Sequence, residues 1–177
     1  MRIIGGKSGG RILKVPKGFD VRPTPDLVKQ AIFNSLGERV HGAAVLELFG
    51  GSGALSLESL SRGASAAVIV EKANRTARMI RDNFESLELQ PNQLELRTQD
   101  AYIAIAQMAQ SGRKFDLISP TRLTGKKTSA NVPKVSRKSS SMIRICPRCW
   151  SKADCLFSVI PSATPWRSQK NGTNAKC

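Results

Sequence analysis

The chain has few of the side chains that catalytic sites use most often. Its 177 residues include one histidine, His41, and one tyrosine, and aromatic residues make up 5% of the chain. One histidine cannot build a histidine-based metal site or supply several catalytic bases, so we expect His41 to lie in a loop. No apolar run approaches the roughly 20 residues that cross a bilayer, and no signal-peptide pattern is present. The sequence therefore predicts a cytoplasmic protein.

Acidic residues are nearly missing from the last third of the chain. Residues 119–177 contain 12 Lys and Arg but only one acid, Asp154, whereas residues 1–118 contain 16 basic and 12 acidic residues. Most of the net charge of +15 therefore lies in this tail. Such an excess of positive charge suggests a polyanionic partner. The four cysteines also lie in the tail, but their spacing offers only one close pair, so we predict no metal site.

A glycine-rich turn follows the most apolar segment of the chain. Residues 43–48 predict a buried strand, residues 50–53 (Gly-Gly-Ser-Gly) a turn, and residues 54–60 a helix. A strand, a glycine turn and a helix in this order form the nucleotide-binding corner of α/β sheets. Glycines allow the backbone to approach a ligand, and a helix N-terminus offers free N–H groups. Glu71 ends the next apolar run, where such folds place a carboxylate for ribose hydroxyls.

The charges beside this turn favour one cofactor class over another. Glu47, near the end of the first strand, would face the two phosphates of a dinucleotide, and Ser56 replaces the third glycine of G-x-G-x-x-G. S-adenosylmethionine carries no phosphate but has a positive amino group and a sulfonium. The residues therefore favour S-adenosylmethionine over NAD, while an NAD-type dehydrogenase and a plain α/β turn remain open.

The remaining segments alternate between helices and strands. Helices are predicted from Thr24-Pro25-Asp26, with Thr24 as the cap, to Gly37, over 74–87 and over 101–108, with strands at 66–70, 94–98 and 115–118. This alternation predicts a parallel sheet with right-handed crossovers. We expect the first helix to bury Val28, Ala31, Ile32 and Leu36. Arg75, Arg78 and Arg81 are interpreted as a solvated face of the helix over 74–87.

The first 23 residues are basic and rich in glycine. Residues 2–16 predict two short strands around the turn at 5–10. From the residues alone, a solvated hairpin and an RNA-contacting hairpin are equally acceptable interpretations.

Several motifs surround the glycine turn in a specific order: Arg-Ile-Ile-Gly-Gly-Lys at 2–7, Arg-Pro-Thr at 22–24, Ala-Ile-Phe-Asn at 31–34 and Ser-Arg-Gly-Ala at 61–64. Through about residue 118, the chain resembles the bacterial 16S ribosomal RNA guanine-N2 methyltransferase family. The resemblance implies a Rossmann-like S-adenosylmethionine methyltransferase sheet with an N-terminal β-hairpin. It also implies a monomer whose partner is 16S ribosomal RNA or a small-subunit particle.

The turn and the resemblance together give two sets of predicted site residues. The cofactor-binding set is Glu47, Phe49, Gly50, Gly51, Ser52, Gly53, Glu71, Lys72, Asp100 and Ala101. The RNA-binding set is Arg2, Lys7, Arg11, Lys14 and Arg22. Asp100 has two interpretations, either near the adenine amino group of the cofactor, which we favour, or as the cap of the helix that follows.

The resemblance breaks down at Ser119. There the family carries Asp-Pro-Pro-Tyr or a close variant, which holds the target base, but this chain reads Ser-Pro-Thr-Arg-Leu-Thr-Gly over 119–125. Deleting one base from codons for Phe-Ala-Asp-Pro-Pro-Tyr-Arg (TTC GCC GAC CCG CCT TAC CGG) gives codons for this same segment. We therefore infer a one-base frameshift after Ile118, and we assign no catalytic residue.

Three regions follow from this inference. Residues 1–23 form a basic extension, 24–118 the donor-binding half of a methyltransferase domain whose sheet is incomplete after the fourth strand, and 119–177 an aberrant basic tail that we expect to be disordered. A catalytically inactive RNA-binding protein is the alternative.

Overall fold

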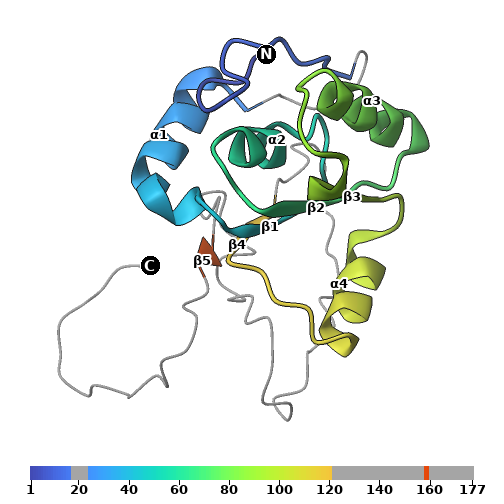
Figure 1. The fold of residues 1–177 in the computed structure, drawn as a ribbon. Helices are drawn as coiled ribbons and strands as arrows, with labels where there is room; N and C mark the ends of the chain where they lie inside the picture. Colours follow the sequence, from blue (N-terminus) through green and yellow to red (C-terminus); the bar gives the residue numbers. More distant parts are fainter. Residues whose placement is uncertain (17–23, 121–157, 160–177) are drawn as a thin grey trace, which may run out of the picture.

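The computed structural model describes residues 1–16, 24–120 and 158–159 (Figure 1). In chain order the elements are α1 (Asp26–Leu36), the 3-10 helix η1 (Gly37–Val40), β1 (Ala44–Leu48), α2 (Ala54–Ser61), β2 (Ala66–Val70), α3 (Asn74–Glu85), the 3-10 helix η2 (Pro91–Gln93), β3 (Leu94–Arg97), α4 (Ala101–Gln110), β4 (Leu117–Pro120) and β5 (Ser158–Val159). Within these ranges, none of the helices has the length and apolar character needed to cross a membrane.

Four parallel strands build the sheet in the order β3-β2-β1-β4, and β5 pairs antiparallel with β4. The chain passes from β1 to β2 and β3, then returns to the other side of β1. The strand order therefore reverses between β1 and β4. Open α/β sheets bind ligands outside the carboxyl ends of their strands at such a point. The predicted α/β class and parallel sheet are confirmed.

The helices cover the two faces of the sheet unequally. Figure 1 shows the sheet nearly edge-on, with α1, α2 and α3 on one side and α4 on the other. Alternating strand residues separate into the two layers: Val45 and Ala67 pack on the α2 side, whereas Leu46 and Val68 pack toward α4. Because α2 and α3 both connect strands that run in one direction across the sheet, right-handed crossovers put them on the same face.

The predicted buried face of α1 is partly wrong. Val28 and Ala31 are exposed, whereas the buried residues of the helix are Lys29, Phe33 and Leu36. The apolar pattern failed because a lysine occupies a core position, where oxygen acceptors bind its ammonium group. The predicted threonine cap is also wrong, since Pro25 stands at the N-cap and no side chain caps the helix.

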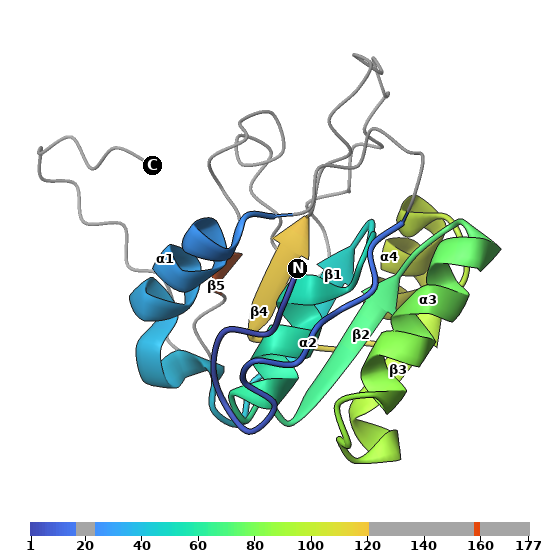
Figure 2. The same cartoon turned by 90° about the horizontal axis from the view of Figure 1, so that it is seen from above.

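Residues 1–16, here called the N-terminal arm, lie across α2 between α1 and α3 (Figure 2). The arm folds back on itself through one antiparallel bridge, between Arg2 and Ile12. Backbone hydrogen bonds from Ile3 to Arg11 (2.9 Å) and from Leu13 to Met1 (2.8 Å) flank the bridge. The predicted pair of strands is not confirmed, because much of the backbone between them bonds to α2 instead.

Smaller differences concern the ends of elements. The helix predicted over 74–87 ends at Glu85, and the helix predicted over 101–108 continues to Gln110. The fourth strand lies two residues later than predicted, and just before it Asp116 bonds to Ala44 through its backbone N–H and its carboxylate. The two-residue β5 was not predicted, since two residues carry no periodicity. Most of the tail lies outside the described residues.

Candidate functional site

The glycine turn after β1 has the tight backbone that its sequence predicted. Gly51 and Gly53 adopt positive φ values of 55° and 71°, and Phe49 reaches 59°, which is uncommon for a residue with a side chain. Gly50 approaches β2 so closely that a Cβ atom would lie 2.4 Å from a methyl carbon of Ile69. The turn is therefore shaped by close backbone packing, and a non-glycine outlier in such a place often marks a functional site.

Glu47 binds the start of the helix that follows the turn. Its side chain is 1% exposed, and its Oε2 accepts a hydrogen bond of 2.9 Å from the backbone N–H of Ser56 in the first turn of α2. An N–H group at the positive end of this helix therefore already has a carboxylate acceptor. Dinucleotide-binding folds place pyrophosphate at this end of the helix. The arrangement disfavours a phosphate ligand, because a carboxylate already accepts from one of the N–H donors that a phosphate would use.

Glu71 connects the same turn to β2 and α3. Its Oε2 accepts from the N–H of Gly51 (3.0 Å) and its Oε1 from the N–H of Ala73 (2.9 Å). The side chain is half-buried at the carboxyl end of β2. An ionised carboxylate has about four lone-pair sites, so each oxygen retains capacity for a further donor such as a hydroxyl.

Asp100 stands at the carboxyl end of the β3 side of the sheet. Its Oδ1 accepts from the N–H of Tyr102 (3.0 Å), so it caps α4, as one of its two interpretations predicted. Its Oδ2 lies 3.4 Å from Nζ of Lys72, whose side chain is largely exposed. Ala101 is buried in the first turn of α4. The role of Asp100 near an adenine amino group stays a prediction.

The predicted cofactor residues converge on one edge of the sheet. Phe49, Glu71 and Asp100 follow β1, β2 and β3, and all three are half-buried there. Ser119 reaches the same edge on β4, where it is paired in register with Glu47 and is fully buried. Ser119 therefore borders the reversal of strand order, whereas Thr121, which corresponds to the base-holding acid in the restored frame, lies outside the described residues.

The cations predicted to bind RNA are mostly paired with acids. Arg2 lies 3.5 Å from Asp26, Arg11 is 2.8 Å from Glu88, and Lys14 is 3.0 Å from Asp82; all six side chains have large exposed fractions. Lys7 is exposed, and its side chain has no ion pair among the described residues. Arg22 lies outside the described residues.

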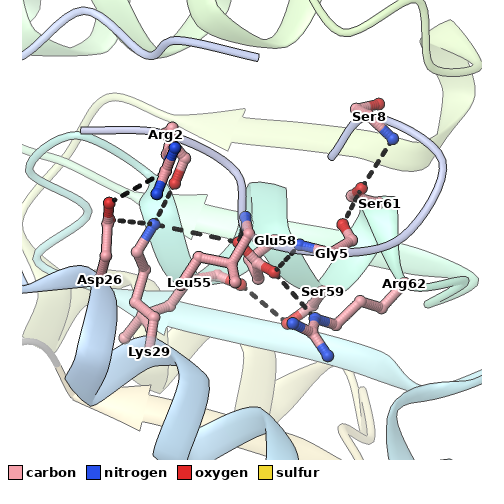
Figure 3. Close-up of polar contacts among 11 residues, drawn as sticks. Arg2, Gly5, Ser8, Asp26, Lys29, Leu55, Glu58, Ser59, Ser61 and Arg62 are labelled. Atoms are coloured by element: carbon pink, nitrogen blue, oxygen red, sulfur yellow. Dashed lines mark hydrogen bonds and ion pairs between the residues drawn. The ribbon is translucent and has the colours of Figure 1, made fainter. Parts of the chain in front are cut away.

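A buried charged cluster under the arm was not predicted from the sequence (Figure 3). Glu58 of α2 is fully buried and accepts from the N–H groups of Ile4 (2.8 Å) and Gly5 (2.9 Å) and from Nε of Arg62 (2.8 Å). Lys29 Nζ lies 3.9 Å from Glu58 and 3.3 Å from Asp26, and it donates to the carbonyl of Arg2. The cluster fixes the arm and α1 to α2. Its one sequence signal is an acid inside an otherwise uncharged helix.

Asn83 of α3 joins the arm to the glycine turn. Its Oδ1 accepts from the N–H of Lys14 (2.8 Å), and its Nδ2 donates to the carbonyls of Lys14 (3.0 Å) and Ser52 (3.3 Å). The side chain is 1% exposed. A polar residue on the buried face of an amphipathic helix was the available signal, but sequence reasoning missed it.

Comparisons with known proteins agree with this geometry. Residues 1–121 match the family described as Conserved hypothetical protein 95. Ribosomal RNA small subunit methyltransferase D of Escherichia coli strain K12 is 41% identical over 88 residues, covering 50% of this chain and 44% of that protein. The Haemophilus influenzae protein of the same name is 34% identical over 118 residues, covering 67% and 61%.

A solved structure shares the fold. A hypothetical protein of Thermus thermophilus superposes with a TM-score of 0.58 at 30% identity, over 66% of this chain and 65% of that one. The chain spans about half the length of the curated relatives that it matches. The family match includes the arm, the glycine turn and all four parallel strands, and it ends one residue after β4. The chain therefore belongs to the Conserved hypothetical protein 95 family.

Proposed function

We propose that this chain derives from an S-adenosylmethionine-dependent methyltransferase of guanine N2 in 16S ribosomal RNA, with a complete donor site and an impaired acceptor site. The relatives named as small-subunit ribosomal RNA methyltransferases support the reaction class and the substrate. Such an enzyme would act in the cytoplasm, and we expect it to be monomeric.

One observation carries the donor half of the proposal. The Glu47 carboxylate accepts the Ser56 N–H at the start of α2, so the anion-binding position of the corner already holds a negative charge. A ligand with a positive amino group and a sulfonium gains from this charge, whereas pyrophosphate loses. Because Glu47 is buried, we expect it to act on the ligand through the electric field of its carboxylate at the turn.

The other residues of the corner fit the same ligand. Glu71 retains acceptor sites for ribose hydroxyls, and Gly50 and Gly53 keep side chains out of the turn. The bound donor supplies an electrophilic methyl group. The protein must hold the accepting amine in line with this methyl group, because methyl transfer depends on alignment within a few tenths of an ångström.

The acceptor half is where we expect impairment. Ser119 stands at the carboxyl end of β4, beside β1, and Ser119–Gly125 contains neither a carboxylate nor an aromatic ring. Those are the groups that the family resemblance assigns to holding guanine. We accordingly propose residues 1–23 as an RNA-contacting extension, 24–118 as the donor half and 119–177 as the product of a shifted reading frame.

Calorimetry tests the donor site. The chain should bind S-adenosylmethionine and S-adenosylhomocysteine but not NAD. Glu71→Gln should weaken donor binding by about 1–3 kcal/mol, because ribose hydroxyls lose a charged acceptor. Glu85→Gln, which removes an exposed carboxylate from α3, is the matched control and should bind normally. Binding of NAD without binding of the donor would reject the proposal.

A second experiment tests the acceptor site. The chain and a version with one base restored after codon 118 are incubated with undermethylated small-subunit particles and labelled donor. Methyl transfer to guanine N2 should require the restored frame. Equal transfer by both proteins would place the acceptor site elsewhere and would reject the proposal that a frameshift impairs methyl transfer.

A further inference from the structure

Three arginines form a row along the exposed face of α3. Arg75, Arg78 and Arg81 follow one another at intervals of three, and all are exposed. Within residues 1–16 and 24–120, none of the three side chains takes part in an ion pair, a hydrogen bond or a ring contact. Their charges are therefore available to a ligand, unlike those of most cations in the arm.

The arm and this row belong to one surface. Asn83 holds the backbone of Lys14 against α3, and two ion pairs, Lys14–Asp82 and Arg11–Glu88, join the arm to α3 and to the loop that follows it. The exposed charged side chains of the arm, α3 and the loop that follows α3 are seven cations and three acids: Arg2, Lys7, Arg11, Lys14, Arg75, Arg78, Arg81, Asp82, Glu85 and Glu88. Two of the acids are already paired with arm cations, so the unpaired positive charge lies mainly on α3.

The row begins beside the donor corner. Glu71 accepts the N–H of Ala73 immediately before α3, and the same carboxylate accepts the N–H of Gly51 in the glycine turn. Arg75 lies in the first turn of α3. A polyanion bound along the row would therefore extend to the sheet edge where the proposed donor binds.

We propose that Arg75, Arg78 and Arg81, together with Lys7, provide the main phosphate contacts to substrate RNA, and that the paired arm cations contribute less. The proposal rests on the proposed function, because it takes the partner to be RNA. Guanidinium groups suit phosphate oxygens, since their donors are arranged in a planar fork. Contacts of this kind position the RNA backbone and carry little sequence information.

The test compares variants of equal charge. Arg75→Gln/Arg78→Gln removes two cations from the row, and Arg39→Gln/Lys114→Gln removes two exposed cations from η1 and from the loop between α4 and β4. Binding of protein-free 16S ribosomal RNA is measured by fluorescence anisotropy from about 50 to 200 mM salt. Both proteins retain the basic tail, so its non-specific contribution cancels in the comparison.

We expect the row variant to bind roughly tenfold more weakly and its salt dependence to flatten by about 0.7 in log–log slope for each phosphate group that is no longer bound. The control should stay within about twofold of the parent chain, because exposed charges away from the binding surface contribute only long-range attraction. Equal weakening in the two variants, or RNA binding unchanged in both, would overturn the inference. Donor affinity is measured in parallel: if the donor fails to bind any of the proteins, the proposed function fails, while the RNA comparison still decides the role of the row.

Discussion

The two faces of the sheet are held by different forces. On the α4 face, the buried cluster is wholly apolar and includes Leu46, Val68 and Met108. On the opposite face, apolar residues share the interior with Glu47, Lys29, Glu58 and other buried polar groups. The buried interior of the α4 face is apolar, whereas the interior of the opposite face also contains buried side chains that form specific hydrogen bonds.

This difference follows from what each face must hold. A helix such as α4 presents a regular apolar stripe and can be fixed by burial of area. The N-terminal arm has little regular structure, so its backbone N–H groups need partners, and Glu58, Ser61 and Asn83 provide them. Buried polar side chains therefore fix the position of the arm. Removing one of them should lower the free energy of unfolding by more than a substitution of similar size on the α4 face.

Replacement of Glu58 by alanine should produce the largest effect. It would leave Lys29 buried beside one remaining carboxylate and would deprive Ile4, Gly5 and Arg62 of their acceptor. Loss of one partner from a buried ionic cluster typically costs about 3–5 kcal/mol. The measurement is the free energy of unfolding in urea, followed by circular dichroism.

The control for this prediction is Met108→Leu on the α4 face. The substitution conserves volume and should cost less than about 1.5 kcal/mol. If Glu58→Ala costs no more than Met108→Leu, the buried cluster does not hold the arm and the contrast between the faces is wrong.

Replacement of Asn83 by alanine should have an intermediate effect. It leaves the N–H and carbonyl of Lys14 and the carbonyl of Ser52 without this side chain, at a cost of about 1–3 kcal/mol. The loss should be local: amide exchange of Lys14 should accelerate by more than global destabilisation explains. The amide of Leu13, which donates to the carbonyl of Met1, is the internal control. Equal acceleration of both amides would show general loosening of the arm rather than loss of one anchor.

Sequence patterns predicted the parts of the molecule that depend on apolar periodicity and on backbone conformation. The four parallel strands and the glycine turn followed from such patterns, because Gly51 and Gly53 occupy backbone conformations that favour glycine. The convergence of Phe49, Glu71 and Asp100 on one edge followed as well, since parallel strands end at the same side of a sheet.

The missed parts depend on long-range polar partners. Lys29 is buried on α1 although the apolar pattern of the helix did not include it, and its contacts with Arg2, Asp26 and Glu58 explain this burial. Asp26 is a neighbour of Lys29 on α1, but Arg2 and Glu58 lie on other elements, and no local pattern brings these two to Lys29. The arm pairs with itself at the bridge between Arg2 and Ile12, but other backbone groups of the arm bond to side chains of α2 and α3, which no local pattern indicates.

The smallest expected effect concerns a charged cluster at the edge of the α4 face. Burial raises the pKa of Glu95, but hydrogen bonds from Arg113 and Arg97 outweigh burial and hold this pKa below its usual value of 4.5. A carboxyl group whose pKa is lower in the folded protein stabilises it above the unfolded pKa, and this contribution disappears as the pH falls through the folded pKa. Because 39% of the side chain is exposed, we expect this contribution to stability to be less than about 1 kcal/mol at neutral pH.

Glu95→Gln should therefore lower the free energy of unfolding slightly at pH ~7, and the difference from the parent chain should shrink below about pH 4. Glu85→Gln, at an exposed carboxylate outside any described ion pair, should differ little from the parent at either pH. A difference for Glu95→Gln that persists or grows in acid would show that this edge cluster acts through packing, as the rest of the α4 face does.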